Sequence, residues 1–174
     1  GYAASNIPNY VDNIHAIIDI SGFISLETFF KAFVRGAISI CRPALKRYEK
    51  KANPSFYNSN AIDALNKTKA KILVIHDEND NMVKYEYSSL LLKENVHNPN
   101  FQLIITNGKH HNPNYTYDAV NYMREIFGKY SIECKKKRIK TLDDRFKYFK
   151  DVDWLRMTEQ DKDIWNKIFD VIGE

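Results

Sequence analysis

Apolar and polar positions along the chain alternate between short strand-like runs and longer helical patterns. The clearest strand lies at residues 72–75, an unbroken run of isoleucine, leucine and valine, which is typical of a strand buried on both faces of a parallel sheet. Mostly apolar runs also occupy residues 14–20 and 101–106. Because helical patterns separate these runs, the sequence predicts an α/β fold with a mostly parallel sheet flanked by helices.

Helical spacing is clearest in three segments between and after the strands. Ser25 is a suitable N-cap for a helix whose apolar residues recur up to Ile38. Residues 85–95 form the helix that leads to the third strand, with three consecutive leucines toward the sheet. Asn112-Pro113 predicts the start of a further helix, which Gly128 would end at about Phe127.

The end of the chain has a different character. Residues 131–174 are predicted to be a basic, helical C-terminal extension of a main domain at residues 1–130. A capping-box-like sequence at residues 158–161 predicts the start of its last helix. That helix carries an apolar stripe that must pack on another surface; the stripe is Ile164, Trp165, Ile168, Phe169 and Ile172.

A polar insertion separates the first two strands of the predicted sheet. Residues 41–60 contain two prolines and favour short helices and loops over core structure. Together with the helix that follows Ser25, they predict a small helical cap at about residues 24–66.

Composition limits the class of protein. The chain has 174 residues, 44% of them hydrophobic and 28% charged, as expected of one globular domain with its own core. Its apolar runs are too short for a membrane span. Cys41 and Cys134 give neither a disulfide framework nor a metal-ligand spacing, so a cytoplasmic location is the default expectation.

Positive charge is concentrated in one segment. Residues 132–150 carry eight Lys or Arg and three Asp or Glu, a local charge of +5 within a chain of net charge +4. The remaining residues therefore sum to −1, and no nucleic-acid partner is predicted for the domain as a whole. The basic run at residues 135–138 is most simply solvated; the alternative is contact with an anionic membrane or a nucleic acid.

Polar side chains with chemical potential follow two neighbouring strands. Residues 76–81 read HDENDN after the second strand, and residues 108–111 read GKHH after the third. Because the carboxyl ends of parallel strands meet at one edge of a sheet, a carboxylate such as Asp80 can orient a histidine such as His111.

No metal or cofactor is predicted at these strand ends. Adjacent histidines point in different directions, so their adjacency is weak evidence for a metal. Residues 77–81 superficially resemble a calcium loop, but Met82 stands where glycine is required and Ser88 where glutamate is required.

The order of elements, with HDENDNMV at residues 76–83 and GKHH at residues 108–111, resembles the C-terminal half of an α/β-hydrolase. Many members of that superfamily carry H-G-x-x-D-x-x-V and G-x-G-H in these places. The resemblance implies that Asp80 is the acid of a catalytic triad and His111 its general base. Asp77 and His110 stand where the family usually has glycine, and His110 is the alternative base.

The resemblance also extends to the first residues of the chain. Gly1-Tyr2-Ala3-Ala4 resembles the helix that follows the nucleophile elbow, G-x-S-x-G, of these enzymes. The elbow itself occurs nowhere in the 174 residues, and neither Ser21 nor Ser25 lies in one. In this family the chain order is serine, acid, histidine, so the resemblance implies a nucleophile upstream of Gly1. This chain alone is then expected to be inactive.

Two functions follow as expectations. The first is the C-terminal part of a serine hydrolase, of esterase, lipase or peptidase type, that cleaves a small-molecule or peptide ester or amide. Four phenylalanines are candidates for its apolar acyl pocket, although an amphipathic helix explains them as well: Phe23, Phe29, Phe30 and Phe33.

The second is a non-catalytic hydrolase-like fragment or pseudoenzyme that binds protein. Half of a parallel sheet has an open strand edge, which invites pairing with the missing N-terminal half or with another copy of the chain.

Overall fold

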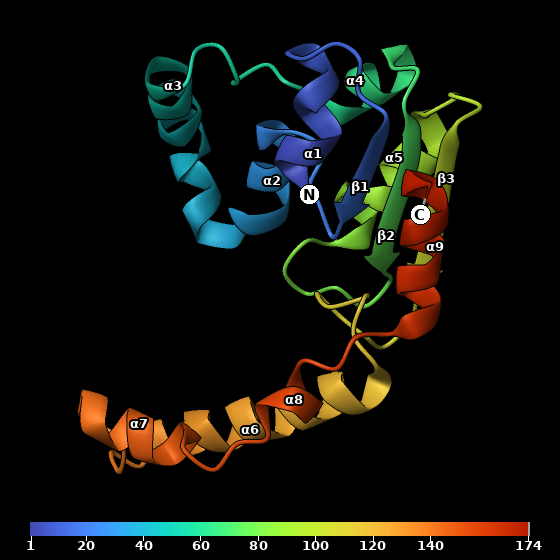
Figure 1. Cartoon of the computed structure of the whole chain (residues 1–174). Helices are drawn as coiled ribbons and strands as arrows, with labels where there is room; N and C mark the ends of the chain where they lie inside the picture. The colour runs from blue at the N-terminus through green and yellow to red at the C-terminus, as the bar shows by residue number, and fades with distance from the viewer. Residues whose placement is uncertain (174) are drawn as a thin grey trace.

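A three-stranded parallel sheet forms the centre of the molecule (Figure 1). The structure is a computed structural model and describes residues 1–173. The strands are β1 (Ala16–Ile20), β2 (Lys71–Asp77) and β3 (Phe101–Thr106), in that order across the sheet. Ile75 of β2 is the register partner of Ile20 in β1 and of Ile104 in β3. The predicted α/β fold with a parallel sheet flanked by helices is therefore confirmed.

The central strand β2 separates two hydrophobic clusters, because successive side chains of a strand point to opposite faces. Ile72 and Val74 belong to one cluster, and Leu73 and Ile75 to the other; each of the four is at most 1% exposed. The continuous apolar run in the sequence thus reflects burial on both faces of the sheet.

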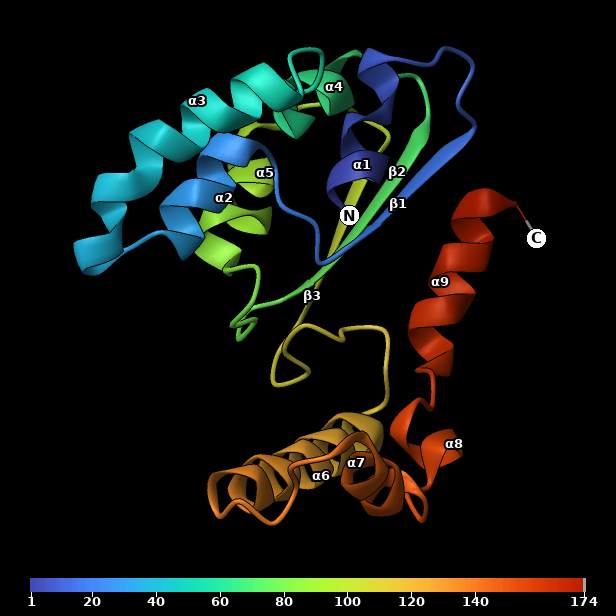
Figure 2. The ribbon, with the colours of Figure 1, turned by 90° about the vertical axis from the view of Figure 1, so that its left-hand side faces the viewer.

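One face of the sheet is covered by α1 (Tyr2–Asn6), α4 (Ala61–Lys67) and α5 (Ser89–Asn95) (Figure 2). Leu65 of α4 and Leu92 of α5 are almost fully buried in this cluster. The 3-10 helices η1 (Ile7–Asn9) and η3 (Tyr85–Tyr87) precede β1 and α5. The predicted helix at residues 85–95 is therefore present but interrupted at Ser88.

The opposite face is covered by α9 (Lys162–Ile172) (Figure 2). Ile164, Ile168 and Val171 of α9 are buried against Leu73 and Ile75, and Trp165 packs beside them. The predicted stripe is therefore correct for Ile164, Trp165 and Ile168 but not for Phe169, which is 39% exposed. The expected capping box at residues 158–161 is wrong in detail, because Asp161 itself is the N-cap. Its carboxylate accepts hydrogen bonds from the first turn of the helix.

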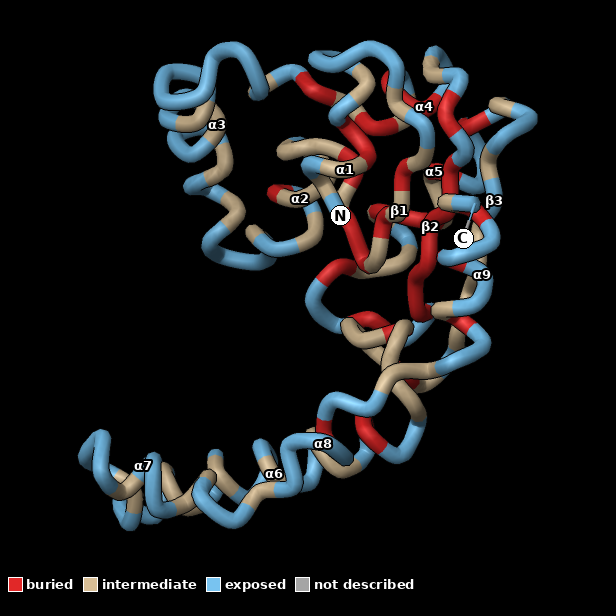
Figure 3. Tube along the Cα trace, in the orientation of Figure 1, coloured by how far each residue is buried: buried red, intermediate tan, exposed pale blue. Residues whose placement is uncertain are grey.

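The segment between β1 and β2 is mainly helical, with α2 (Leu26–Phe33), η2 (Gly36–Cys41) and α3 (Arg42–Ala52) preceding α4. Ser25 is the N-cap of α2, as predicted, and forms a reciprocal capping box with Thr28. Helix α3 contains no buried residue and lies away from the sheet (Figures 1 and 3).

Three helices extend away from the sheet: α6 (Tyr117–Lys135), α7 (Leu142–Phe149) and α8 (Trp154–Met157) (Figure 1). The predicted start of this segment's helix at Asn112 is wrong, because Asn112 accepts a turn hydrogen bond from Tyr115 and Thr116 caps α6 instead. The predicted end at Gly128 is also wrong. Helix α6 continues through it while the Tyr148 hydroxyl of α7 donates to the Ile126 carbonyl, a tertiary contact that helps offset the helix cost of glycine.

The sheet with its covering helices and the three helices that extend away from it differ in burial. The strands and the inner faces of their covering helices are buried, whereas α6 and α7 are mostly exposed or half-buried (Figure 3). Every helix within residues 1–173 is too short or too polar to cross a lipid bilayer. The predicted domain boundary at residue 130 stays a prediction. Helix α9 lies after that residue in the chain, and its apolar side chains are part of the hydrophobic core on one face of the sheet.

Candidate functional site

The turn after β2 holds the carboxylate of Asp80 in a fixed position. The Asp80 N–H donates to the carbonyl of Asp77 at 3.1 Å. One carboxylate oxygen of Asp80, Oδ1, accepts hydrogen bonds from the backbone N–H groups of Met82 and Val83 at 2.7 and 2.9 Å. The second oxygen, Oδ2, is left for a partner outside the turn.

Asp77 connects this turn to the loop that follows β3. Its carboxylate accepts hydrogen bonds from the Thr106 hydroxyl and the Lys109 N–H, both at 2.8 Å, and from the Gly108 N–H at 3.3 Å. It also accepts one from the N–H of Asn79 at 2.9 Å. Asp77 is thus a structural carboxylate whose acceptor sites are filled, and Asp80 is the acid that remains for chemistry.

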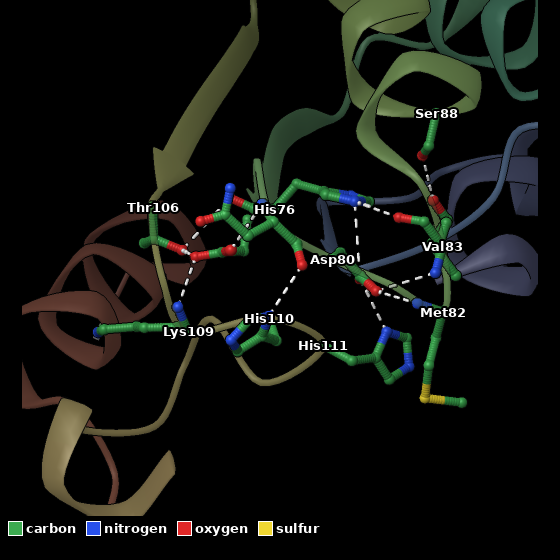
Figure 4. Close-up of polar contacts among 12 residues, drawn as sticks. His76, Asp80, Met82, Val83, Ser88, Thr106, Lys109, His110 and His111 are labelled. Atoms are coloured by element: carbon green, nitrogen blue, oxygen red, sulfur yellow. Dashed lines mark hydrogen bonds and ion pairs between the residues drawn. The ribbon is translucent and has the colours of Figure 1, made fainter. Parts of the chain in front are cut away.

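The two loops bring Asp80 and His111 together (Figure 4). Nδ1 of His111 lies 2.8 Å from Oδ2 of Asp80. The Asp80 side chain is fully buried, whereas that of His111 is 36% exposed. Because a carboxylate can only accept, Nδ1–H is the donor, and Nε2 of the neutral ring carries the basic lone pair. In the described part of the chain, this Nε2 has no hydrogen-bond partner.

The surroundings of Asp80 keep it ionised. Burial alone raises the pKa of this carboxyl, but the hydrogen bond from His111 and those from the backbone of Val83 and Met82 outweigh burial. The pKa of Asp80 is therefore held below its ordinary value. An ionised Asp80 fixes the Nδ1–H tautomer of His111 and stabilises the imidazolium that forms when Nε2 takes a proton.

His110, the alternative base, has a different partner. Its Nδ1–H donates to the Asn79 carbonyl at 2.9 Å, and its backbone has a positive φ of 55°. The structure therefore pairs Asp80 with His111 and directs His110 to the neighbouring turn. A polar hollow of about 300 Å³ lies beside the turn, and its lining includes Asp80, Lys84 and His110.

His76 supports Asp80 from within the core, a role that the sequence pattern did not reveal. Its ring is fully buried, and its Nε2–H donates to the Val83 carbonyl at 2.8 Å. The same nitrogen lies 3.7 Å from Oδ2 of Asp80. His76 thus positions the segment whose N–H groups hold Asp80.

Lys109 is the second residue whose role the pattern did not reveal. Its side chain is buried, and Nζ forms an ion pair with the carboxylate of Asp161, the N-cap of α9. Nζ also lies 4.9 Å from the centre of the Tyr117 ring. The loop that carries His111 is therefore connected to the helix on the far face of the sheet.

The four phenylalanines predicted for substrate binding form one aromatic cluster. Phe29 lies at its centre, with ring centroids 4.9 Å from Phe23, 5.9 Å from Phe30 and 4.5 Å from Phe33. Phe23 also stacks on Tyr2 at 4.5 Å. Helix α2 contacts η3, which follows the Asp80 turn, so the cluster adjoins the segment next to the site. Their contact with substrate stays a prediction.

The site can transfer a proton through Nε2 of His111. Within residues 1–173, no group of three or more His, Cys, Asp or Glu side chains could hold a metal ion. No family model, curated protein or solved structure matches this chain. The geometry of these residues is therefore what supports a function.

Proposed function

We propose that this chain supplies the acid and the general base of a serine hydrolase acting on an ester or amide. The observation that carries the proposal is the hydrogen bond of 2.8 Å between Nδ1 of the partly exposed His111 and the buried Asp80. A buried carboxylate behind an accessible imidazole is the arrangement that activates a hydroxyl nucleophile.

The positions that differ from the α/β-hydrolase pattern fit the same proposal. His110 stands where the family usually has glycine, and its φ of 55° is a conformation that glycine adopts with least strain. Asp77 replaces another glycine, and its carboxylate is fully engaged in holding the two loops together. Both departures leave the Asp80–His111 pair intact.

The proposed reaction has two steps at His111. The serine oxygen attacks the carbonyl carbon while Nε2 accepts its proton, and the leaving alcohol or amine then takes that proton as its bond to carbon breaks. In the second step, water attacks the acyl-enzyme, Nε2 accepts a proton from the water, and that proton passes to the departing serine oxygen. Asp80 stays ionised and stabilises the imidazolium in both steps.

The nucleophile of this proposal belongs to a preceding segment of the parent protein. Within the chain, Ser21 directly follows β1 and has a positive φ of 52°, and its hydroxyl has no hydrogen-bond partner among the described residues. However, Ser21 is only 5% exposed, so a substrate carbonyl cannot approach its oxygen. The phenylalanine cluster, in which Phe33 is 42% exposed, is proposed as part of an apolar acyl site.

Labelling with a fluorophosphonate probe tests the proposal. The parent protein and the chain of 174 residues are each incubated with the probe, and the modified residue is located by mass spectrometry. We expect a labelled serine N-terminal to Gly1 in the parent and no label in the chain alone. His111→Ala should slow labelling at least about 1,000-fold, because an unassisted serine is a weak nucleophile.

His110→Ala is the matched control, because it removes the neighbouring imidazole without touching Asp80. It should label at close to the parent rate. Loss of labelling in His110→Ala alone would assign the base to His110, and labelling of Ser21 would place the nucleophile inside the chain. A folded parent protein that takes no label would overturn the hydrolase proposal.

A protein-binding module is the second candidate function, and one observation favours it. Strand β1 is paired only with β2 within the described residues, so its other edge is open. Open edges add strands from other chains. A hydrolase-like scaffold without activity would use this edge to bind its partner.

A further inference from the structure

The helices that extend from the sheet form a second surface, distinct from the Asp80–His111 site. We call residues 117–157, which contain α6, α7 and α8, the helical arm. An open groove of about 850 Å³ lies on it, and most of its wall is apolar. The apolar and aromatic residues that line the groove are Phe127, Tyr130, Leu142, Phe146, Phe149 and Trp154.

Several large apolar side chains of the arm are exposed, and most of them lie together. Leu142 is 66% exposed, Phe146 68%, Trp154 50% and Leu155 87%. Single exposed apolar residues are normal on a protein surface, but three of these four line the same groove. A contiguous patch of this kind marks an interaction surface.

Positive charge surrounds this apolar groove. Arg145, Lys147 and Lys150 line it, and no carboxylate side chain does. Two nearby carboxylates are engaged by backbone N–H groups: Asp144, the third residue of α7, accepts from the N-cap Thr141, and Asp153 caps α8. The groove thus combines an apolar floor with cations that have no acidic counterpart in its wall.

A second copy of the arm does not fit this charge pattern. In a two-fold symmetric contact the same patch meets itself, so the cations of one groove would face those of the other. Residues outside the basic segment at 132–150 sum to a charge of only −1, so the rest of the chain has no large net negative charge to attract the groove. The charge favours an external, anionic partner.

The aromatic packing favours a lipid surface over single-stranded nucleic acid. Bases stack on exposed ring faces, but Phe149 packs against Phe127, Tyr130 and Trp154 with ring centroids 5.0 to 6.0 Å apart. The most exposed apolar residues of the arm are instead Leu142, Phe146 and Leu155, of which two are aliphatic and suit an acyl layer. Trp, Phe and Leu beside Lys and Arg are the residues of helices that bind anionic membranes.

We propose that the helical arm binds the surface of a membrane rich in anionic phospholipid, with the groove toward the lipid. Leu142, Phe146 and Trp154 enter the boundary between headgroups and acyl chains, and the three cations lie at the headgroup phosphates. The attachment is peripheral and independent of the chemistry at His111.

Vesicle binding of the whole chain tests this proposal. The chain is sedimented with phosphatidylcholine vesicles that contain or lack phosphatidylserine. We expect binding only with phosphatidylserine, and weaker binding as added salt screens the charges. Arg145→Gln, Lys147→Gln and Lys150→Gln together should lower the partition coefficient about 100-fold. The matched control, with the same residue types on exposed α3, is Arg47→Gln, Lys50→Gln and Lys51→Gln.

The apolar contribution has its own variants. Leu142→Ser with Phe146→Ser should weaken binding, whereas Ile40→Ser with Phe56→Ser should not, because that exposed pair lies outside the arm. All four positions are exposed, so these variants keep the fold. In a Trp165→Phe background, the fluorescence of Trp154 should shift to the blue when vesicles are added.

Three results would overturn the proposal. One is the absence of binding to phosphatidylserine vesicles at low salt. Another is an equal loss of binding in the α3 control and the arm variant, which would indicate a general charge effect. The third is retention of a single-stranded RNA oligomer through Arg145, Lys147 and Lys150 without vesicle binding, which would reassign the surface to nucleic acid.

Discussion

Two carboxylates three residues apart have different roles at the end of β2. Asp77 accepts hydrogen bonds from both loops, whereas Asp80 shares its carboxylate between its own turn and His111. In both, hydrogen bonds outweigh the effect of burial and lower the pKa of the carboxyl. Each group is therefore ionised in the folded protein at a pH where an unfolded aspartate begins to take up protons.

Acid stability is the measurable consequence of these lowered pKa values. A group whose pKa is lower in the folded state stabilises the fold above its unfolded pKa of about 3.9, and that contribution is lost as the pH falls through the folded pKa. We expect the free energy of unfolding to fall below about pH 4. Asp80→Asn should reduce the steepness of this fall and lower stability at pH 7 by about 1–3 kcal/mol.

Urea unfolding between about pH 3 and pH 7, followed by tryptophan fluorescence, measures this dependence. Asp12→Asn is the control, since Asp12 is exposed. His111→Ala should also make the acid dependence less steep, because it removes a hydrogen bond that lowers the pKa of Asp80. An Asp80→Asn curve parallel to that of the wild type would show that Asp80 is not stabilised by these contacts.

The sequence was informative about Asp80 and His111 but not about their supports. Strand ends in a parallel sheet meet at one edge, so an acid and a histidine after adjacent strands were predicted to approach each other, and they do. The roles of His76 and Lys109 depend on partners 7 and 52 residues away. No local pattern encodes such contacts, because they exist only after the loops have folded.

At the scale of elements, the Lys109–Asp161 pair connects the site loop to α9. Lys109 is nearly fully buried, and its ammonium has the Asp161 carboxylate and the Pro113 carbonyl as partners. Asp161 also caps α9 through the N–H groups of Asp163 and Ile164. One side chain thus neutralises a buried cation and begins the helix that covers Leu73 and Ile75.

Removing that side chain should be costly. Asp161→Ala leaves Lys109 without its counter-ion and α9 without its N-cap, and we expect a loss of about 3–5 kcal/mol in the free energy of unfolding. Asp161→Asn, which keeps the cap, should cost less. Adding Lys109→Met to Asp161→Asn should recover part of the loss, because no buried charge is left unpaired.

A double-mutant cycle by chemical denaturation measures this coupling. The exposed pair Glu125–Lys129 is the control, and its removal should have little effect on the free energy of unfolding. Additive effects of the Lys109 and Asp161 changes would show that the two residues are independent, and would contradict the connection between the loop and α9.

At the scale of the whole molecule, the last helix shows what pattern reasoning can and cannot supply. An amphipathic stripe indicates that a helix buries one face, and Ile164, Ile168 and Val171 do so. It does not indicate the partner surface, which here is a strand about 90 residues earlier in the chain. For the same reason the sequence predicts this helix as part of a C-terminal extension, although it covers the sheet.

The last prediction concerns the edge strand β1, whose side away from β2 has no neighbouring strand within the described residues. Lys71 donates to the His15 carbonyl and Ser21 donates to the Ile75 carbonyl, so the odd-numbered residues of β1 direct their backbone groups toward β2. The backbone N–H and C=O groups of the even-numbered residues therefore face the open edge, and these residues are Ala16, Ile18 and Ile20. Another strand would find unpaired donors and acceptors there. We expect the isolated chain to associate through this edge as its concentration rises.

Ala16→Pro should weaken that association. Proline removes the N–H of Ala16 on the open side, and as the first residue of a strand it leaves the bonds to β2 in place. Ala16→Val is the matched control, because it also enlarges the side chain but keeps the N–H. Sedimentation velocity across a concentration series should show weaker association for Ala16→Pro than for the wild type. Ala16→Val should associate as strongly as the wild type. A chain that stays monomeric at every concentration, or associates equally in both variants, would mean that β1 is not the contact, and the protein-binding alternative would lose the observation that favours it.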